Sequence, residues 1–295
     1  MSLQILETVE RLIRRGIYTG PLVLNCCEGV RLRFHVEKTV GVLPSLAIRQ
    51  LGGQLPMGDF ELAHLADPMT DLACVRSRDL YTPLGRFPDR LARYAELAGR
   101  EIDFDTLLYY SVKTQALVPL SLAPVMENLH AGTEHAEWIA QHVFYLRTTA
   151  EVLAEAIGLE LAPVELPSGR ETRFSAYYDM LLENLEREQA PAIRDAFLTN
   201  RMWFTSRLAR HLRNAERLGP GFERQELDDM GELLGRRPRT VQEGHRAVDA
   251  FVRSASPDAD ADLVRYFHRH ARREEALMEG ALGMCEGASL SPLRA

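Results

Sequence analysis

The chain has 295 residues, of which 46% are hydrophobic and 26% are charged, and its formal net charge at pH 7 is −7. This composition is typical of a soluble globular protein with one large or two ordinary domains. The negative charge argues against a general nucleic-acid-binding protein, and no apolar run approaches the ~20 residues that span a bilayer. Four cysteines without a C-x-x-C spacing indicate neither a zinc site nor a disulfide framework. We therefore expect a cytoplasmic protein without a membrane segment.

The chain opens with a predicted helix and a predicted strand. Apolar residues recur at helical spacing from Leu3 to Ile17. Charged residues such as Glu10 and Arg14 interrupt them, which excludes the uninterrupted apolar core of a signal peptide. Pro21 to Asn25 then predicts a short buried strand.

The next segment has no clear periodicity. Residues 36–54 contain several glycines and a proline, and their apolar residues do not alternate cleanly, so we expect irregular structure there. Glu28 is the acid that lies nearest to the strand before this segment, and a solvated turn residue is the simplest interpretation of it. No aspartate precedes Asp59 anywhere in the chain.

The stretch from Gly58 to Ala73 reads G-D-F-E-L-A-H-L-A-D-P-M-T-D-L-A. A short apolar approach precedes Asp59, which places Asp59 at the end of a predicted strand, where an acid is well placed to hold a metal. Asp67 followed by Pro68 is a strong helix-start pair, since Asp is favoured at the N-cap and Pro at the first helical position. Asp71 then lies near the positive end of the predicted helix.

This stretch resembles the D-[FW]-E-L-A-H-L-G-D-P-x-x-D-L-A segment of the aminoglycoside phosphotransferase and choline kinase-like family. The likeness is to the bacterial branch related to the kinase-like domains found with acyl-CoA dehydrogenases. That family has the protein-kinase-like fold and phosphorylates hydroxyl groups of small molecules with Mg-ATP. The resemblance implies that Asp59 binds Mg²⁺ and that Asp71, with Asp67, anchors the catalytic loop. Ala66 stands where the family usually has glycine.

Other parts of the family pattern are not recognisable. The resemblance implies a catalytic loop with a proton-accepting Asp and a Mg-binding Asn, but Cys26 to His35 departs from that pattern. Glu28 is a candidate substitute base, and Arg33 stands about where the Asn belongs. No glycine-rich phosphate-covering loop of an N-terminal lobe is recognisable either. The resemblance therefore covers the C-terminal lobe, from about Ile5 to about Gly158, with a break at 26–57.

Helices fill the remainder of the predicted structure. Pro88 to Ala98 predicts a helix closed by Gly99, and Asp103 caps a helix that is apolar all round and therefore expected to be buried. Pro119 and Pro124 are expected to break or kink that helix. A further helix opens near Thr133 and ends at Gly158. Beyond a linker at 163–169, we predict helices at about 171–188, 191–218, 222–234, 238–255 and 260–287.

For the polar and aromatic residues of the second half, the sequence predicts mainly structural roles. One predicted helical face carries four arginines, which indicate a solvated face or, alternatively, a site for an anion or an acidic partner: Arg207, Arg210, Arg213 and Arg217. His268 and His270 are two residues apart and point to different sides of a helix, so we do not expect them to share a metal. Residues 202–204 (Met-Trp-Phe) are predicted to be core.

Taken together, the sequence predicts a mainly α chain with a few short strands. A protein-kinase-like C-terminal lobe at 1–162, disrupted at 26–57, precedes the linker at 163–169 and a helical bundle of unknown role at 170–295. The predicted function is phosphorylation of a small-molecule hydroxyl substrate, with Mg²⁺ and ATP as the cofactors implied by the resemblance, in a truncated and catalytically impaired chain.

The sequence is also compatible with two different interpretations. The first is a non-catalytic, pseudokinase-derived helical binding module that contacts a protein partner through its C-terminal helices. The second is a compensated frame change between Asn25 and Gly58. In that event, the alternative reading frames across this stretch should restore an Asp and an Asn at kinase spacing.

Overall fold

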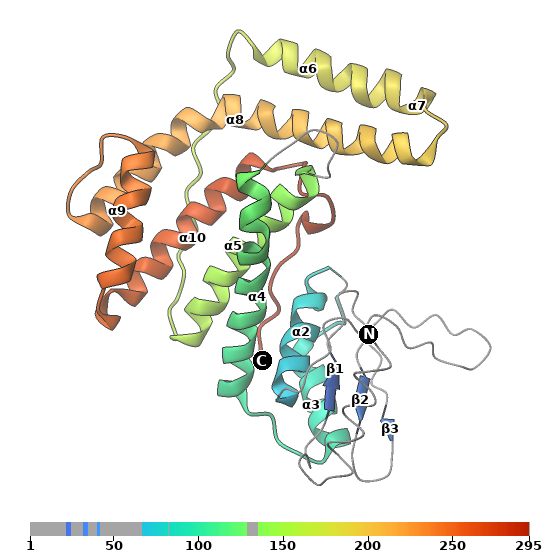
Figure 1. Cartoon of the computed structure of the whole chain (residues 1–295), viewed down its shortest axis with the longest axis vertical. Coiled ribbons are helices and arrows are strands. Elements are labelled where there is room, and N and C mark those ends of the chain that lie inside the picture. The colour runs from blue at the N-terminus through green and yellow to red at the C-terminus, as the bar shows by residue number, and fades with distance from the viewer. Residues whose placement is uncertain are drawn as a thin grey trace. The chain divides into compact units, whose positions relative to one another are not determined.

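A computed structural model gives the fold (Figure 1). It describes residues 67–81, 83–128 and 135–294, together with the backbone of three short strands at 22–24, 32–34 and 40–41. Within these residues the chain is mainly helical, which confirms the predicted class. Two compact units are present: the first comprises Met1–Thr114 with Leu290–Ala295, and the second comprises Gln115–Ser289. The units divide between Thr114 and Gln115, and the predicted linker at 163–169 lies inside the second unit.

The described strands of the first unit form a three-stranded antiparallel sheet. Strands β1 (Leu22–Leu24), β2 (Leu32–Phe34) and β3 (Val40–Gly41) follow one another in the order β1-β2-β3. Leu22 pairs with Phe34, which in turn pairs with Val40 on the other side. All the described strands lie in the first 60 residues, as predicted, although β3 falls inside the segment that we expected to be irregular.

Helix α2 (Pro68–Asp79) begins where the sequence predicts a helix start. The side chain of Asp67 accepts a hydrogen bond of 2.8 Å from the backbone N–H of Met69, and Pro68 occupies the first turn. Such a cap satisfies one of the backbone N–H groups that a helix start leaves without a partner. Helix α3 (Phe87–Ala98) ends at Gly99, whose φ of 61° is the left-handed conformation expected of a glycine cap.

The last residues of the chain belong to the core of the first unit. Leu293 is buried in one cluster with Met69 and Leu72 of α2 and with Leu91 of α3. Arg76 of α2 donates hydrogen bonds of 3.0 and 2.8 Å to the backbone oxygen of Ser291. The C-terminal segment therefore contributes to the same core as residues that are more than 200 positions earlier in the chain.

Helix α4 (Phe104–Glu127) begins after Asp103, which caps it by accepting a 3.0 Å hydrogen bond from the N–H of Thr106. The helix continues through Pro119 and Pro124, so these residues do not end it, and the alternative of a kink stays a prediction. An interior proline costs about 3 kcal/mol, which buried packing on one face of a helix is able to offset. The expectation that this helix is buried all round is wrong, since exposed apolar side chains lie along it: Tyr109, Leu117 and Leu120.

Helices form the second unit. In Figure 1, α5 and α10 lie side by side, and the segment from α6 to α7 runs antiparallel to the first half of α8. Residues 159–172, which include the predicted linker, form neither helix nor strand. The elements are α5 (His135–Ala156), α6 (Ser175–Glu183), the π-helix η1 (Asn184–Gln189), α7 (Ala190–Ala192), α8 (Ala196–Leu234), α9 (Val241–Ser254), the 3₁₀ turn η2 (Pro257–Ala259), α10 (Asp260–Leu277) and the 3₁₀ turn η3 (Gly283–Cys285).

Helix α8 is one continuous helix of 39 residues, so the prediction of two helices separated at 219–221 is wrong. Gly221 is explained by close approach of another segment. A Cβ added at this position would lie 2.9 Å from Cβ of Pro167, which belongs to the predicted linker. Because glycine has no side chain, residues of the linker can pass close to α8 at this position while the helix continues. The helix predicted over 260–287 ends earlier than expected, at Leu277.

Candidate functional site

The predicted site residues lie mostly outside the described part of the chain. Asp59 and Glu28 belong to the residues that the structure does not describe. No distance or contact can therefore be given for the predicted Mg²⁺ site. Asp67 is the N-cap of α2, and Asp71 is half-buried in the first turn of the same helix. The predicted bonds from Asp71 to the backbone of 26–32 concern undescribed residues and stay a prediction.

The second unit contains a buried charge cluster that sequence reasoning missed. At its centre is the carboxylate of Glu226 on α8, which is only 5% exposed. Its Oε1 atom accepts hydrogen bonds from the Tyr266 hydroxyl at 2.7 Å, from His270 Nδ1 at 3.0 Å and from His245 Nε2 at 3.4 Å. Its Oε2 atom accepts from Arg273 Nη2 at 2.5 Å and Nε at 3.2 Å. We call these five residues the Glu226 cluster.

Further ion pairs extend the Glu226 cluster along α8. Arg273 Nη1 lies 2.7 Å from Oδ2 of Asp229, and Arg269 Nε lies 3.1 Å from the same oxygen. Arg269 also reaches Glu232 at 3.7 Å. A buried charge is stable only when it is paired and hydrogen-bonded, and this network supplies such partners to Glu226 and Arg273.

The environment of the cluster shifts the pKa values of its members. Burial alone would raise the pKa of Glu226, but hydrogen bonds from His245, His270 and Tyr266 outweigh it and hold that pKa well below its usual range. Burial would lower the pKa of His270, whereas its hydrogen bond to Glu226 and the charge of Glu226 raise it overall. Burial and the neighbouring carboxylate both raise the pKa of Tyr266. The structure therefore favours an ionised Glu226 beside a protonated Tyr266.

The cluster combines three helices, which explains why the sequence did not reveal it. Tyr266, His270 and Arg273 follow one another at spacings of four and three on α10, so they share one helical face. That spacing was a usable local signal, but the acceptor Glu226 and the third ring, His245, come from α8 and α9. His268 is not a member of this cluster.

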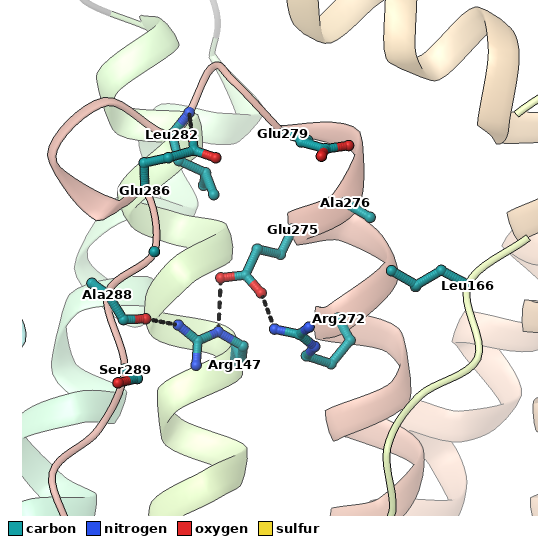
Figure 2. A pocket seen from close by; sticks show the side chains of 11 residues that line it. Arg147, Leu166, Arg272, Glu275, Ala276, Glu279, Leu282, Glu286, Ala288 and Ser289 are labelled. Carbon is teal, nitrogen blue, oxygen red and sulfur yellow. Dashed lines mark hydrogen bonds and ion pairs between the residues drawn. The ribbon is translucent and has the colours of Figure 1, made fainter. Parts of the chain in front are cut away.

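A cavity of about 420 Å³ lies elsewhere in the second unit, between α5, α10 and residues 282–289 (Figure 2). Glu275 bridges two guanidinium groups there, at 2.7 Å from Arg147 Nε and 2.6 Å from Arg272 Nη1. Arg147 also donates to the backbone oxygen of Ala288 at 2.7 Å. Because both guanidinium groups have carboxylate partners, the cavity does not favour phosphate binding.

The arginine face of α8 is paired within the chain. Each of the four arginines of the predicted stripe has an acidic partner: Arg207 with Glu137 at 2.5 Å, Arg210 with Glu186 at 2.6 Å, Arg213 with Asp179 at 2.5 Å and Arg217 with Glu171 at 2.7 Å. Arg207 is buried, whereas the other three arginines are partly exposed, so the face is solvated in part and each of its cations already has an acidic partner within the chain. Trp203, predicted to be core, is 46% exposed and lies against the Arg207 guanidinium, 4.4 Å from it.

Comparisons with known proteins found no match to the chain. No protein-family model matches the chain, and neither the curated proteins nor the solved structures contain a significant match. Among the described residues, no helix is both long enough and apolar enough to cross a membrane.

Proposed function

We propose that the chain is a small-molecule phosphotransferase of the aminoglycoside phosphotransferase and choline kinase-like type, with impaired catalysis. The observation that carries the proposal is the contiguous family-like segment from Asp59 to Ala73. Its second half has, in the structure, the helix start that the segment implies, with Asp67 as the side-chain cap and Pro68 in the first turn.

The requirements of phosphoryl transfer indicate which roles the residues of this segment would have. Catalysis depends on positioning and on neutralising the charge of the phosphates, which requires metal ligands and a group that orients the hydroxyl nucleophile. By the resemblance, Asp59 would bind the Mg²⁺ of Mg-ATP, and Asp71 would support the loop before it. Glu28 is the candidate base, because no aspartate precedes Asp59 in the chain. Impaired catalysis follows from this reduced set.

The affinity for Mg-ATP tests the proposal. One carboxylate holds Mg²⁺ weakly, since the ion gives up its water shell reluctantly. We expect isothermal titration calorimetry of the full chain to show millimolar binding, equivalent to about −4 kcal/mol. Asp59→Ala should abolish that binding, whereas Asp105→Ala, which removes an exposed acid from the first turn of α4, should leave it unchanged.

The same titration distinguishes the alternatives. Equal binding by wild type and Asp59→Ala would refute the assignment of Asp59 as the metal ligand. Micromolar binding that Asp59→Ala abolishes would keep the phosphotransferase proposal and overturn the statement that catalysis is impaired. Turnover is measured in parallel with amino-alcohol, aminoglycoside and hydroxyacyl acceptors, and we expect none above background.

Exposed apolar side chains favour a second candidate function, the helical binding module. They lie on α6 and on the first half of α8: Tyr177, Met180, Leu181, Phe197, Leu198, Trp203, Leu208 and Leu212. Apolar side chains exposed on two neighbouring helices are a feature of protein-binding faces. The arginines beside it are already paired within the chain, so the face has little charge with which to select a charged partner. The occupant that we propose is a second copy of the chain, because an apolar face can pair with its own copy without charge complementarity.

Sedimentation velocity tests the second candidate. Wild type should show a monomer–dimer equilibrium that depends on concentration, and Phe197→Ser should shift it toward monomer. Val252→Ser is the matched control, because it removes an exposed apolar side chain from α9, outside this face. A single monomeric species at all concentrations would contradict self-association through α6 and α8.

A further inference from the structure

We propose that Glu226, His245 and His270 form a binding site for one divalent transition-metal ion, with Zn²⁺ as the best-fitting ion. The three ligand atoms, Oε1, Nε2 and Nδ1, all lie within 4.8 Å of one another. Oε1 is 3.0 Å from His270 Nδ1 and 3.4 Å from His245 Nε2. Ligand atoms about 3.3–3.4 Å apart are expected around a tetrahedral zinc ion with bonds of about 2.0–2.1 Å.

The number of donors around Oε1 supports a metal at this position. A carboxylate oxygen has two lone pairs, yet Oε1 of Glu226 faces three donors, from Tyr266, His270 and His245. An ion bound between the two imidazoles and Oε1 would replace two of these contacts with a single coordinate bond. Oε1 would then use one lone pair for the metal and the other for the Tyr266 hydroxyl.

The surrounding side chains hold the carboxylate in a suitable orientation. Arg273 engages Oε2, and Tyr266 donates to Oε1, so the carboxylate has one oxygen anchored and the other directed at the histidines. Partners of this kind orient the ligands of natural metal sites and raise metal affinity. The three ligands also come from three packed helices, α8, α9 and α10, which are more rigid than loops.

The ligand types and the local charge select the class of ion. Two imidazoles and one carboxylate suit Zn²⁺ and related transition metals, whereas Mg²⁺ and Ca²⁺ prefer oxygen ligands. Three carboxylates, from Glu226, Asp229 and Glu232, pair with only two guanidinium groups, from Arg269 and Arg273. Glu232 is largely exposed, whereas the carboxylates of Glu226 and Asp229 are mostly buried.

The site also has an approach from solvent. The side chain of His245 is 47% exposed, and that of His270 is 24% exposed, although Glu226 is buried. With three protein ligands, the fourth position of a tetrahedral zinc ion is left for water, as in catalytic zinc sites with a His₂Glu ligand set. This site does not depend on the phosphotransferase proposal, since its ligands lie in the second unit and do not include Asp59.

Metal titration of the full chain tests the proposal. Chelator-stripped protein is titrated with Zn²⁺ in competition with a chromophoric chelator, and we expect one equivalent to bind. His245→Ala should lower the affinity by more than the roughly 10–100-fold that loss of an outer partner costs, and Tyr266→Phe should lower it within that range. The matched control is His211→Ala, which removes a half-buried histidine with one hydrogen bond, of 3.0 Å to the backbone oxygen of Leu277.

Two further measurements separate this site from adventitious binding. Co²⁺ in place of Zn²⁺ should give the visible spectrum of nitrogen and oxygen ligands without a thiolate charge-transfer band, because the site contains no cysteine. Zn²⁺ should also raise the thermal midpoint of wild type and His211→Ala but not that of His245→Ala. Absence of binding, a thiolate band, or equal affinity of wild type and His245→Ala would each overturn the proposal.

Discussion

The buried guanidinium of Arg147 offers a sharp test of how the second unit is held together. Its side chain is almost fully buried and donates to Glu275, to Glu151 and to the backbone oxygen of Ala288, each at 2.7 Å. Replacing it with methionine would leave Glu151 without this cation and Glu275 with Arg272 alone. Removing one partner of a buried pair typically costs about 3–5 kcal/mol, and we expect Arg147→Met to lower the free energy of unfolding by that amount.

Intrinsic fluorescence is a selective assay for this effect. Both tryptophans of the chain, Trp138 and Trp203, lie in the second unit, so their emission reports its unfolding and not that of the first unit. For a unit of this size, a loss of about 3–5 kcal/mol corresponds to a thermal midpoint roughly 6–20 °C lower. Urea unfolding followed at the same wavelength gives the free energy directly.

Two variants separate burial from charge in this experiment. Arg253→Met removes an exposed ion pair with Asp249 in the same unit and should cost at most about 1 kcal/mol. Arg147→Lys keeps the positive charge but lacks the planar fork that reaches three acceptors, so its cost should lie between those of the two methionine variants. If Arg147→Met costs no more than Arg253→Met, the argument that burial makes the Arg147 ion pairs more stabilising than an exposed pair is refuted.

Three further predictions concern single positions. Asp67→Ala should destabilise the start of α2 by about 1 kcal/mol, seen as faster amide hydrogen exchange in that helix, whereas Asp67→Asn should not. Pro220→Ala should stabilise the second unit by about 1–2 kcal/mol in urea unfolding if α8 is continuous, and an unchanged midpoint would argue for a break. Burial lowers the pKa of His142 below its ordinary value of 6.5, so the neutral ring is favoured in the folded state. Its stabilising contribution is therefore present above about pH 6.5 and lost as the pH falls toward the lower folded pKa, and wild type should lose more stability than His142→Gln between about pH 7 and 5.

Helix boundaries were predictable where capping is local. Asp67 caps α2, Asp103 caps α4 and Gly99 closes α3, each through backbone groups no more than a few residues away. Such hydrogen bonds depend only on residue type and short-range geometry, so the sequence alone determines them. The mainly helical class followed from periodicity for the same reason. The kinase-like lobe stays a prediction, because Asp59 and Glu28 lie outside the described residues.

The continuity of α8 and the Glu226 cluster depended on tertiary structure. Pro220 and its flanking glycines favour a break locally, but Phe222 is buried immediately after them, and Gly221 accommodates the crossing of Pro167. Glu226 meets His245 and His270 only because α8, α9 and α10 pack together. A hydrogen bond between residues 19 or 44 positions apart leaves no periodic trace in the sequence, because its energy is gained only after the helices have packed.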